Sequence, residues 1–475
     1  MRAVLWTERR DMKIVIVGDG KVGYALTHEL ANEGHDVVVI DNNPNVLKKS
    51  QEALDVAVVE GNGANVDVQR EADVPISDIL IAATSRDEVN LLCCMTARKL
   101  GCKNTIARVR NPEYDQNLRL LKEELGLSLH INPERTAAKE IFRLLQYPSF
   151  LKRDSFAKGR VELVELKLKD ENMLAGKQLL EMNKLGFGQL NALVCTVDRG
   201  GDVTIPSGSF RLMEGDKITI AADATELAKL LRLLHVDNHA TQSVMIIGGG
   251  RISVYLALLL ARARVQITII EKSRERCERL CELIPDAMVI NGDGTAQDLL
   301  LAEGLESTGA LVTLTDMDEE NLIISMFGNF MGVPKTITKI NRTEYTAVFE
   351  EKGIDTIVSP KQLTADEIIS YVRAIGNTSG GSIVTLYRIM DGEAEAIEFF
   401  IQYDCEASYL HVSLQELRLK PNILIAAIIR ARKVIIPKGG DYMQKGDTVV
   451  VIVAASMGVS DIKDIFVDGI YRMKD

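Results

Sequence analysis

Two stretches of the chain share one pattern of apolar and polar positions. The first has an apolar run at 14–17, a helical pattern at 24–33 and a second apolar run at 36–40. Residues 244–271 repeat this order of apolar run, apolar helix and apolar run. Short uninterrupted apolar runs are typical of strands buried on both faces of a parallel sheet. The pattern therefore predicts a strand–helix–strand unit at each place.

Three glycines follow the first predicted strand. Gly18, Gly20 and Gly23 have G-x-G-x-x-G spacing, which serves a tight turn, the approach of a pyrophosphate and close helix packing, in that order. The start of the helix adds unpaired N–H groups and a positive dipole end. Asp41 ends the second strand, near the separation expected for a carboxylate that accepts ribose hydroxyls. Together these features favour a dinucleotide or nucleotide site over a glycine turn kept only for packing.

Further motifs recur at a constant distance, which indicates a tandem duplication. Gly248 lies 230 residues after Gly18 (248 − 18). The other pairs lie 231 residues apart (292 − 61, 315 − 84 and 339 − 108): Gly61-Asn62-Gly63 with Gly292-Asp293-Gly294, TSRDEVNLL from Thr84 with TDMDEENLI from Thr315, and RVRNPEY from Arg108 with KINRTEY from Lys339.

Strands alternate with helices from Met12 to about Gln146. The expected strands are 14–17, 37–40, 57–59, 79–82, 105–109 and 129–131, with helices that include 88–100, 114–125 and 134–146. This alternation predicts a doubly wound parallel sheet, with a ligand crevice at the carboxyl ends of its strands. Polar residues follow three strand ends: Asp41, Thr84 with Ser85, and Arg108. We expect ligand contacts there, although Thr84 and Ser85 could cap the next helix and Arg108 could be a surface charge.

The pattern changes after Pro148. Residues 160–222 alternate between apolar and polar positions and contain turn glycines, with a hairpin expected at 214–216, and this predicts a small α+β domain with a largely antiparallel sheet. The second copy has the same texture after residue 380, with Pro437 matching Pro206. The predicted order is a large α/β domain, a small β-rich domain, and the same pair again.

Composition narrows the function classes. A net charge of −11 argues against a nucleic-acid backbone or anionic lipid as the main partner. The seven cysteines have no zinc spacing and indicate buried thiols of a reducing compartment. No apolar run reaches the roughly eighteen residues needed to span a bilayer. The fold pattern starts at Lys13, which makes Met12 the expected natural start and residues 1–11 an extension.

These motifs resemble the TrkA family of bacterial Trk potassium-uptake systems in its tandem form. In that form, two RCK (KTN) nucleotide-binding domains are each followed by an RCK C-terminal domain. The resemblance covers residues 12 to about 470 and is carried by GDGKVG at 18–23, DNN from Asp41, TSRDEVN from Thr84, ARVRNPEY from Ala107, GDGT from Gly292 and the twin IP…GD segments from Ile205 and Ile436. It implies domains at 12–133, 153–236, 241–360 and 380–467.

The resemblance also implies a function. The chain would be a peripheral cytoplasmic regulatory subunit that binds NAD(H), and ATP or ADP as well. It would form a homo-oligomer, a ring of four chains, and reach the inner face of the membrane through an integral-membrane potassium-translocating subunit (TrkH/TrkG-like). No catalytic or metal-binding residue is implied. The implied nucleotide contacts are Gly18, Asp19, Gly20, Lys21, Val22, Gly23, Asp41, Thr84, Ser85 and Arg108, with Gly248, Gly250, Arg251, Glu271 and Thr315 in the second half.

The second half departs from the pattern. Ser253 replaces the third glycine, and bulky Tyr255 follows, so we expect a compromised helix contact and a weaker second site. Lys21 and Arg251 occupy a variable slot where a cation can reach an extra phosphate or remain solvated.

The sequence leaves two alternative functions. An NAD-dependent oxidoreductase is disfavoured, because the six histidines have no polar constellation around them. A regulator of a potassium-efflux system of the same superfamily stays open. For assembly, we expect an exposed apolar helix face around Ile323, Ile324, Met326 and Phe327.

Overall fold

The computed structural model describes most of the chain. The described residues are 12–111, 114, 118, 120–157, 159–168, 172–185, 190–234, 241–342, 354, 356–376, 383–405, 407–459 and 461–467. The expected N-terminal extension, residues 1–11, lies outside them, as does part of the expected helix 114–125.

The first large domain is a parallel sheet in the order β3-β2-β1-β4-β5-β6. Its central strands are almost completely buried, as the uninterrupted apolar runs predict. The strands are β1 (Lys13–Val17), β2 (Asp36–Asp41), β3 (Ala57–Glu60), β4 (Ile79–Ala82), β5 (Asn104–Arg108) and β6 (Leu129–Ile131). The helices between them are α1 (Lys21–Asn32), α2 (Pro44–Ala53), α3 (Val66–Glu71) and α4 (Asp87–Leu100).

The second large domain repeats this topology in the order β14-β13-β12-β15-β16-β17. Its strands are β12 (Ser243–Ile247), β13 (Gln266–Glu271), β14 (Ala287–Asn291), β15 (Ala310–Thr313), β16 (Thr336–Lys339) and β17 (Ile357–Val358). Its helices are α8 (Arg251–Arg262), α9 (Arg274–Leu283), α10 (Gln297–Ala302) and α11 (Asp318–Phe330). In both domains the strand order reverses next to the first strand, and ligands bind at such a switch point in open α/β sheets.

Each small domain contains a five-stranded sheet whose neighbouring strands are antiparallel. The first has the order β10-β9-β11-β8-β7, with β7 (Lys152–Phe156), β8 (Val161–Lys167), β9 (Ala192–Arg199), β10 (Asp202–Thr204) and β11 (Lys217–Asp223), and is followed by α7 (Leu227–Leu233). The second has the order β18-β19-β22-β20-β21, with β18 (Ile383–Ile389), β19 (Ala394–Phe400), β20 (Ile423–Arg430), β21 (Lys433–Ile435) and β22 (Thr448–Ala454). The predicted fold class, two Rossmann-like domains each followed by a small α+β domain, is confirmed.

The expected hairpin at residues 214–216 is wrong. That turn leads into β11, but β10, the strand before it, pairs with β9 and not with β11. The hairpin instead joins β9 to β10 through Gly200 and Gly201, which both have positive φ. Turn glycines were recognised correctly, but the partner of each strand depends on the whole sheet.

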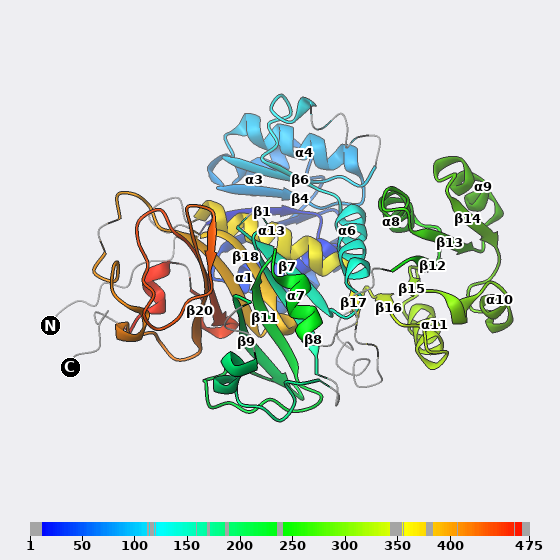
Figure 1. Ribbon diagram of the computed structural model, residues 1–475. Helices are drawn as coiled ribbons and strands as arrows, with labels where there is room; N and C mark the ends of the chain where they lie inside the picture. The colour runs from blue at the N-terminus through cyan, green and yellow to red at the C-terminus, as the bar shows by residue number, and fades with distance from the viewer. Residues whose placement is uncertain are drawn as a thin grey trace.

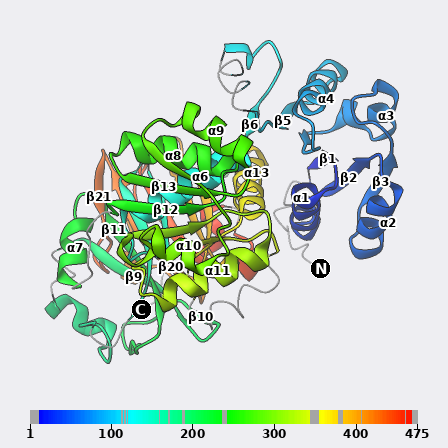
Figure 2. The same ribbon diagram turned by 90° about the vertical axis from the view of Figure 1, so that its right-hand side faces the viewer.

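The two large domains exchange helices. α6 (Pro133–Gln146), which follows the first sheet, packs against α8, and its Ile141 and Leu144 join the core of the second large domain. α13 (Pro360–Gly376), which follows the second sheet, packs against α1, and its Ile368 and Val372 join the core of the first. Cyan α6 lies beside green α8, and yellow α13 beside blue α1, in Figure 1, and Figure 2 shows both exchanged helices between the two large domains.

The small domains also pack on one another. Residues of β8 and β11 share one apolar cluster with residues of β19, β20 and β22. Within it, the rings of Phe156 and Tyr387 meet edge to face at 4.9 Å between centroids. The duplicated halves therefore form a pseudo-symmetric pair inside one chain.

A buried ion-pair network connects α13 to the first large domain and to the second small domain. Arg373 on α13 donates to Glu33, which directly follows α1, and to Glu395 on β19, where the donor–acceptor distance is 3.0 Å. Arg388 on β18 donates to Glu29 on α1 at 2.8 Å.

Candidate nucleotide-binding sites

The first glycine turn has the geometry of a phosphate site. Gly18 has φ +91°, and its N–H donates to Ile40 at 2.8 Å. A Cβ on Gly23 would lie 1.8 Å from the Gly18 carbonyl oxygen, so α1 packs directly on the turn. Gly20 caps α1 without a side-chain hydrogen bond, and a Cβ there would meet nothing within 4 Å. The first N–H groups of α1 therefore face open space, where an anion can bind them.

Asp41 and Asp19 have different roles in this turn. The Asp41 carboxylate accepts N–H groups from Asp19 at 2.7 Å and Asn43 at 2.9 Å, and each oxygen keeps acceptor capacity for a ribose hydroxyl. The Asp19 side chain is only 3% exposed and accepts hydroxyls from Thr27 and Ser50. Burial raises the pKa of Asp19. Asp19 was predicted as a nucleotide contact, but its carboxylate connects the turn to α1 and α2.

The other strand ends of the first half meet at the same edge of the sheet. Arg108 donates from Nη1 to the Thr84 carbonyl at 3.1 Å, while its Nε is buried without a partner. Asn90 on α4 accepts the Thr84 N–H at 2.9 Å and donates to the Arg108 carbonyl at 2.8 Å. Ser85 is exposed at the mouth of this loop. The sequence reasoning missed Asn90, although its recurrence as Asn321 was a usable signal.

The second half builds the same turn. Gly248 has φ +99° and Gly250 caps α8. The Glu271 carboxylate accepts N–H groups from Gly249 and Ser273, both at 2.7 Å. These contacts match those of Asp41, so the longer acid occupies the equivalent place.

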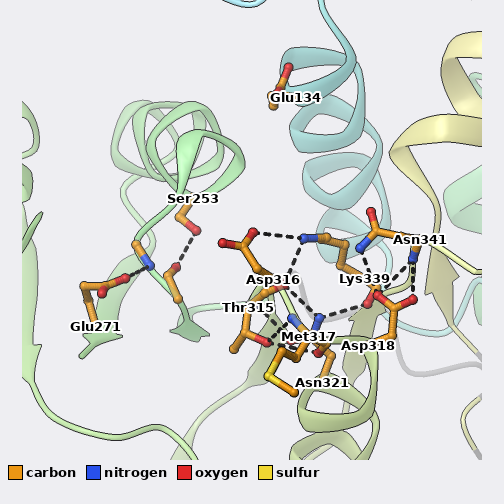
Figure 3. Close-up of polar contacts among 12 residues, drawn as sticks. Glu134, Ser253, Glu271, Thr315, Asp316, Met317, Asp318, Asn321, Lys339 and Asn341 are labelled. Carbon is orange, nitrogen blue, oxygen red and sulfur yellow. Dashed lines mark hydrogen bonds and ion pairs between the residues drawn. The ribbon is translucent and has the colours of Figure 1, made fainter. Parts of the chain in front are cut away.

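The loop opposite this turn, drawn in Figure 3, has the same contacts as the Thr84 loop of the first half. Asn321 accepts the Thr315 N–H at 2.8 Å, and Lys339 donates to the Thr315 carbonyl at 2.8 Å in place of Arg108. Burial lowers the pKa of Lys339, and the charge of Asp316, 3.9 Å from its Nζ, opposes that shift. A cleft of about 150 Å³ lies between this loop and the glycine turn.

Ser253 does not disturb the start of α8. The side chain is completely buried, and its Oγ donates to the Gly248 carbonyl at 2.5 Å (Figure 3). α8 begins at Arg251, just as α1 begins at Lys21. The expected loss of the helix contact is therefore wrong, because a hydrogen bond replaces the close glycine packing. Tyr255 accepts a hydrogen bond from Asn132 at 3.0 Å, next to α6, and so serves the exchanged helix.

The two crevices lie within electrostatic reach of each other. Burial lowers the pKa of Arg108, and the nearby charges of Arg110 and Arg251 lower it further. In the same way, the charge of Lys21 lowers the pKa of Lys339 across the domain contact. Glu134 on α6 acts on both Arg108 and Lys339, and its Oε2 is buried without a partner. The charge of each variable-slot cation thus acts on the basic residue of the opposite crevice, Arg251 on Arg108 and Lys21 on Lys339.

The expected apolar helix face is partly wrong. On α11, Ile323 is 66% and Phe330 85% exposed, and Met326 is also exposed. Ile324 is buried, however, and Phe327 packs against the domain's own core. α4 has a matching exposed pair, Leu92 and Met95.

No helix within the described ranges is long and apolar enough to cross a membrane. The described residues also contain no cluster of histidine, cysteine and acidic side chains that could hold a metal ion. All seven cysteines are free thiols, and burial raises the pKa of Cys93 to about 12.

The fold and the two crevices define a tandem Rossmann-like protein of the nucleotide-binding type. The family model described as the TrkA-N domain matches residues 14–133 and 244–360, and the TrkA-C domain matches residues 163–235 and 401–466. The chain belongs to the TrkA family of Trk system potassium uptake proteins.

Relatives match over nearly the whole chain. The Trk system potassium uptake protein TrkA homolog 2 of Methanosarcina mazei is 32% identical, over 96% of this chain and 100% of that protein. The Trk system potassium uptake protein TrkA of Vibrio alginolyticus is 30% identical, over 96% and 98%.

Solved structures share the fold. The GsuK RCK domain superposes with a TM-score of 0.62 at 20% identity, covering 95% of this chain and 94% of that one. The GsuK channel bound to NAD gives the same TM-score and identity, covering 95% of this chain and 78% of that one.

Proposed function

We propose that this chain is a non-enzymatic, peripheral cytoplasmic regulatory subunit of a Trk-type potassium-uptake system. It binds NAD(H), and ATP or ADP, and controls a separate integral-membrane potassium-translocating subunit (TrkH/TrkG-like). The observation that carries the proposal is the pair of glycine turns, each facing a carboxylate, in a chain of the TrkA family. The NAD bound to the GsuK channel supports the choice of dinucleotide.

The first crevice assigns a role to each part of the ligand. The open N-terminus of α1, with Gly20 to Val22, receives the pyrophosphate. Asp41 accepts the ribose hydroxyls with the acceptor capacity that its backbone contacts leave. Arg108 offers its unpartnered buried Nε to a phosphate oxygen.

Electrostatics make coupling between the crevices possible. Because the charge of Glu134 on α6 acts on both Arg108 and Lys339, a charged ligand in one crevice changes the field in the other. Such a ligand regulates transport only if it binds two conformations of the protein unequally.

Assembly follows from the exposed apolar faces of α4 and α11. Two similar faces on the halves of one chain can pair with faces of other chains, and closed symmetry is the common result. We propose a ring of four chains. A monomeric mass at micromolar concentration in light scattering would contradict it.

A matched pair of variants tests ligand binding. A Cβ at Gly20 or at Gly250 meets no protein atom within 4 Å, so alanine there leaves the fold intact and intrudes only on a bound pyrophosphate. Gly20→Ala should remove NADH binding at the first crevice, and Gly250→Ala the binding at the second, by calorimetry. If both variants together leave the binding isotherm unchanged, the glycine turns are not the sites.

Regulation requires a separate measurement. NADH and ATP should change potassium flux through the co-reconstituted membrane subunit, and the Gly20→Ala chain should respond less. Unchanged flux with bound nucleotide would remove the sensing role. Steady consumption of NADH by the purified chain would favour the oxidoreductase alternative, and co-purification with an efflux protein would favour the efflux regulator.

A further inference from the structure

The outer end of the second crevice is lined by two cations. Lys272 and Arg276 both border the cleft beside Glu271. Lys272 donates to Asp293 at 2.9 Å, and Arg276 lies 3.9 Å from the Glu271 carboxylate. Both cationic side chains are largely exposed, at 79% and 59%. They can therefore turn toward a ligand at little cost, because exposed ion pairs contribute little to stability.

The first crevice lacks these cations. Asn42 and Val46 occupy the positions that match Lys272 and Arg276. Asp41 also pairs in register with Glu60, whereas Glu271 pairs with an asparagine. The ribose end of the first crevice therefore holds two carboxylates with no cation at these two positions. At the second, Lys272 and Arg276 stand beside Asp293 and Glu271, although Glu320 also borders the cleft and its charge acts on Lys272.

The acid itself does not distinguish the crevices. Asp41 and Glu271 each accept two backbone N–H groups with similar geometry, so each is held in the place where ribose hydroxyls bind. The crevices differ in the side chains that a phosphate on the 2′ oxygen of the ribose would meet. At the first crevice a 2′-phosphate meets uncompensated carboxylates, and at the second it meets a lysine and an arginine, which suits phosphate.

We propose that the second crevice accepts a 2′-phosphorylated dinucleotide, NADP(H), with Lys272 and Arg276 binding the 2′-phosphate. This proposal rests on the function proposed above. Arg276 binds the phosphate through its guanidinium, and Lys272 exchanges Asp293 for a phosphate oxygen. Glu271 accepts the neighbouring ribose hydroxyl. The chain then senses two dinucleotide pools, NAD(H) at the first crevice and NADP(H) at the second.

The experiment measures each crevice alone in the full-length chain. Gly20→Ala leaves the second crevice, and Gly250→Ala leaves the first. NADPH should bind the Gly20→Ala chain within about tenfold of NADH, and should bind the Gly250→Ala chain at least about tenfold more weakly than NADH, a difference of about 1.4 kcal/mol. In the Gly20→Ala chain, Lys272→Ala with Arg276→Ala should weaken NADPH at least about tenfold and leave NADH within about threefold.

Arg274→Ala is the matched control. Arg274 lies on the same helix and pairs with Glu278 at 3.1 Å, but it does not border the cleft. Retained NADH binding shows that a variant is folded. The proposal is overturned if NADPH binds the Gly20→Ala chain more than tenfold more weakly than NADH does. It is also overturned if Arg274→Ala weakens NADPH binding as much as Lys272→Ala with Arg276→Ala does. If neither dinucleotide binds the unaltered chain, the proposed function itself fails.

Discussion

Replacing Arg373 with methionine should loosen α13 from both of its partners. The guanidinium is only 13% exposed and pairs with Glu33 and Glu395, whose side chains are 9% and 4% exposed. Removing one partner from a buried ion pair leaves uncompensated charge and costs about 3–5 kcal/mol. Here two carboxylates lose their main cation, and Arg388 remains 3.9 Å from each. We therefore expect about 3 kcal/mol, the lower end of that range.

Hydrogen exchange is the suitable assay, because a chain of four domains does not unfold in a single two-state step. Amides of α1 and α13 report the free energy of local opening at the network. A loss of about 3 kcal/mol corresponds to exchange about a hundredfold faster there. Amides of α8, on the other large domain, should be unaffected.

Two further variants separate charge burial from lost packing. Arg274→Met breaks an exposed pair with Glu278 and should cost at most about 1 kcal/mol. Combining Arg373→Met with Glu33→Gln and Glu395→Gln removes the uncompensated charges, so it should cost less than Arg373→Met alone. The reasoning would be refuted if these amides exchanged in Arg373→Met within threefold of the rate in the unaltered chain. It would also be refuted if they exchanged faster in the triple variant than in Arg373→Met.

Three further predictions concern ribose recognition, pH and assembly. Asp41→Ala should weaken NADH at the first crevice at least about tenfold in calorimetry, and an unchanged affinity would show that the carboxylate does not touch the ribose. Burial raises the pKa of Glu140 from 4.5 to about 7, so the folded chain keeps a proton that the unfolded chain has lost, and stability falls as pH rises through that window. Glu140→Gln should flatten this fall in the opening free energy of α6, measured by hydrogen exchange between pH 5 and 7.5, and an unaltered slope would contradict it. Phe330→Glu, at an exposed position, should reduce the mass measured by light scattering, and an unchanged mass would place the interface elsewhere.

Much of each large domain could be predicted because its signals are local. The runs at 14–17 and 79–82 are apolar at every position, and a strand buried on both faces requires that. The glycine turns could be located because a φ of +91° at Gly18 and of +99° at Gly248 disfavours any other residue there. The duplication placed Glu271 and Thr315 by their distance from Asp41 and Thr84.

Other features required the tertiary structure, because they join residues far apart in the chain. The sequence showed an aspartate at position 19, but only the packing of α1 and α2 turned its carboxylate inward. It showed a serine at 253, but not the hydrogen bond that accommodates it. The sequence did not show that Ile324 and Phe327 of α11 pack inward, because the elements that pack against a helix decide which of its faces is exposed.

By itself, therefore, the sequence determined the two nucleotide-type folds, their order and the chemistry at each glycine turn, since these depend on residues close together along the chain. Only the tertiary structure decided that α6 and α13 cross to the opposite domain, that Arg373 pairs α13 with Glu33, and that the charge of Arg251 acts on Arg108. The apolar face of such a helix could pack against either of the two similar large domains. The geometry of the assembled core, and not the local pattern, selects between them.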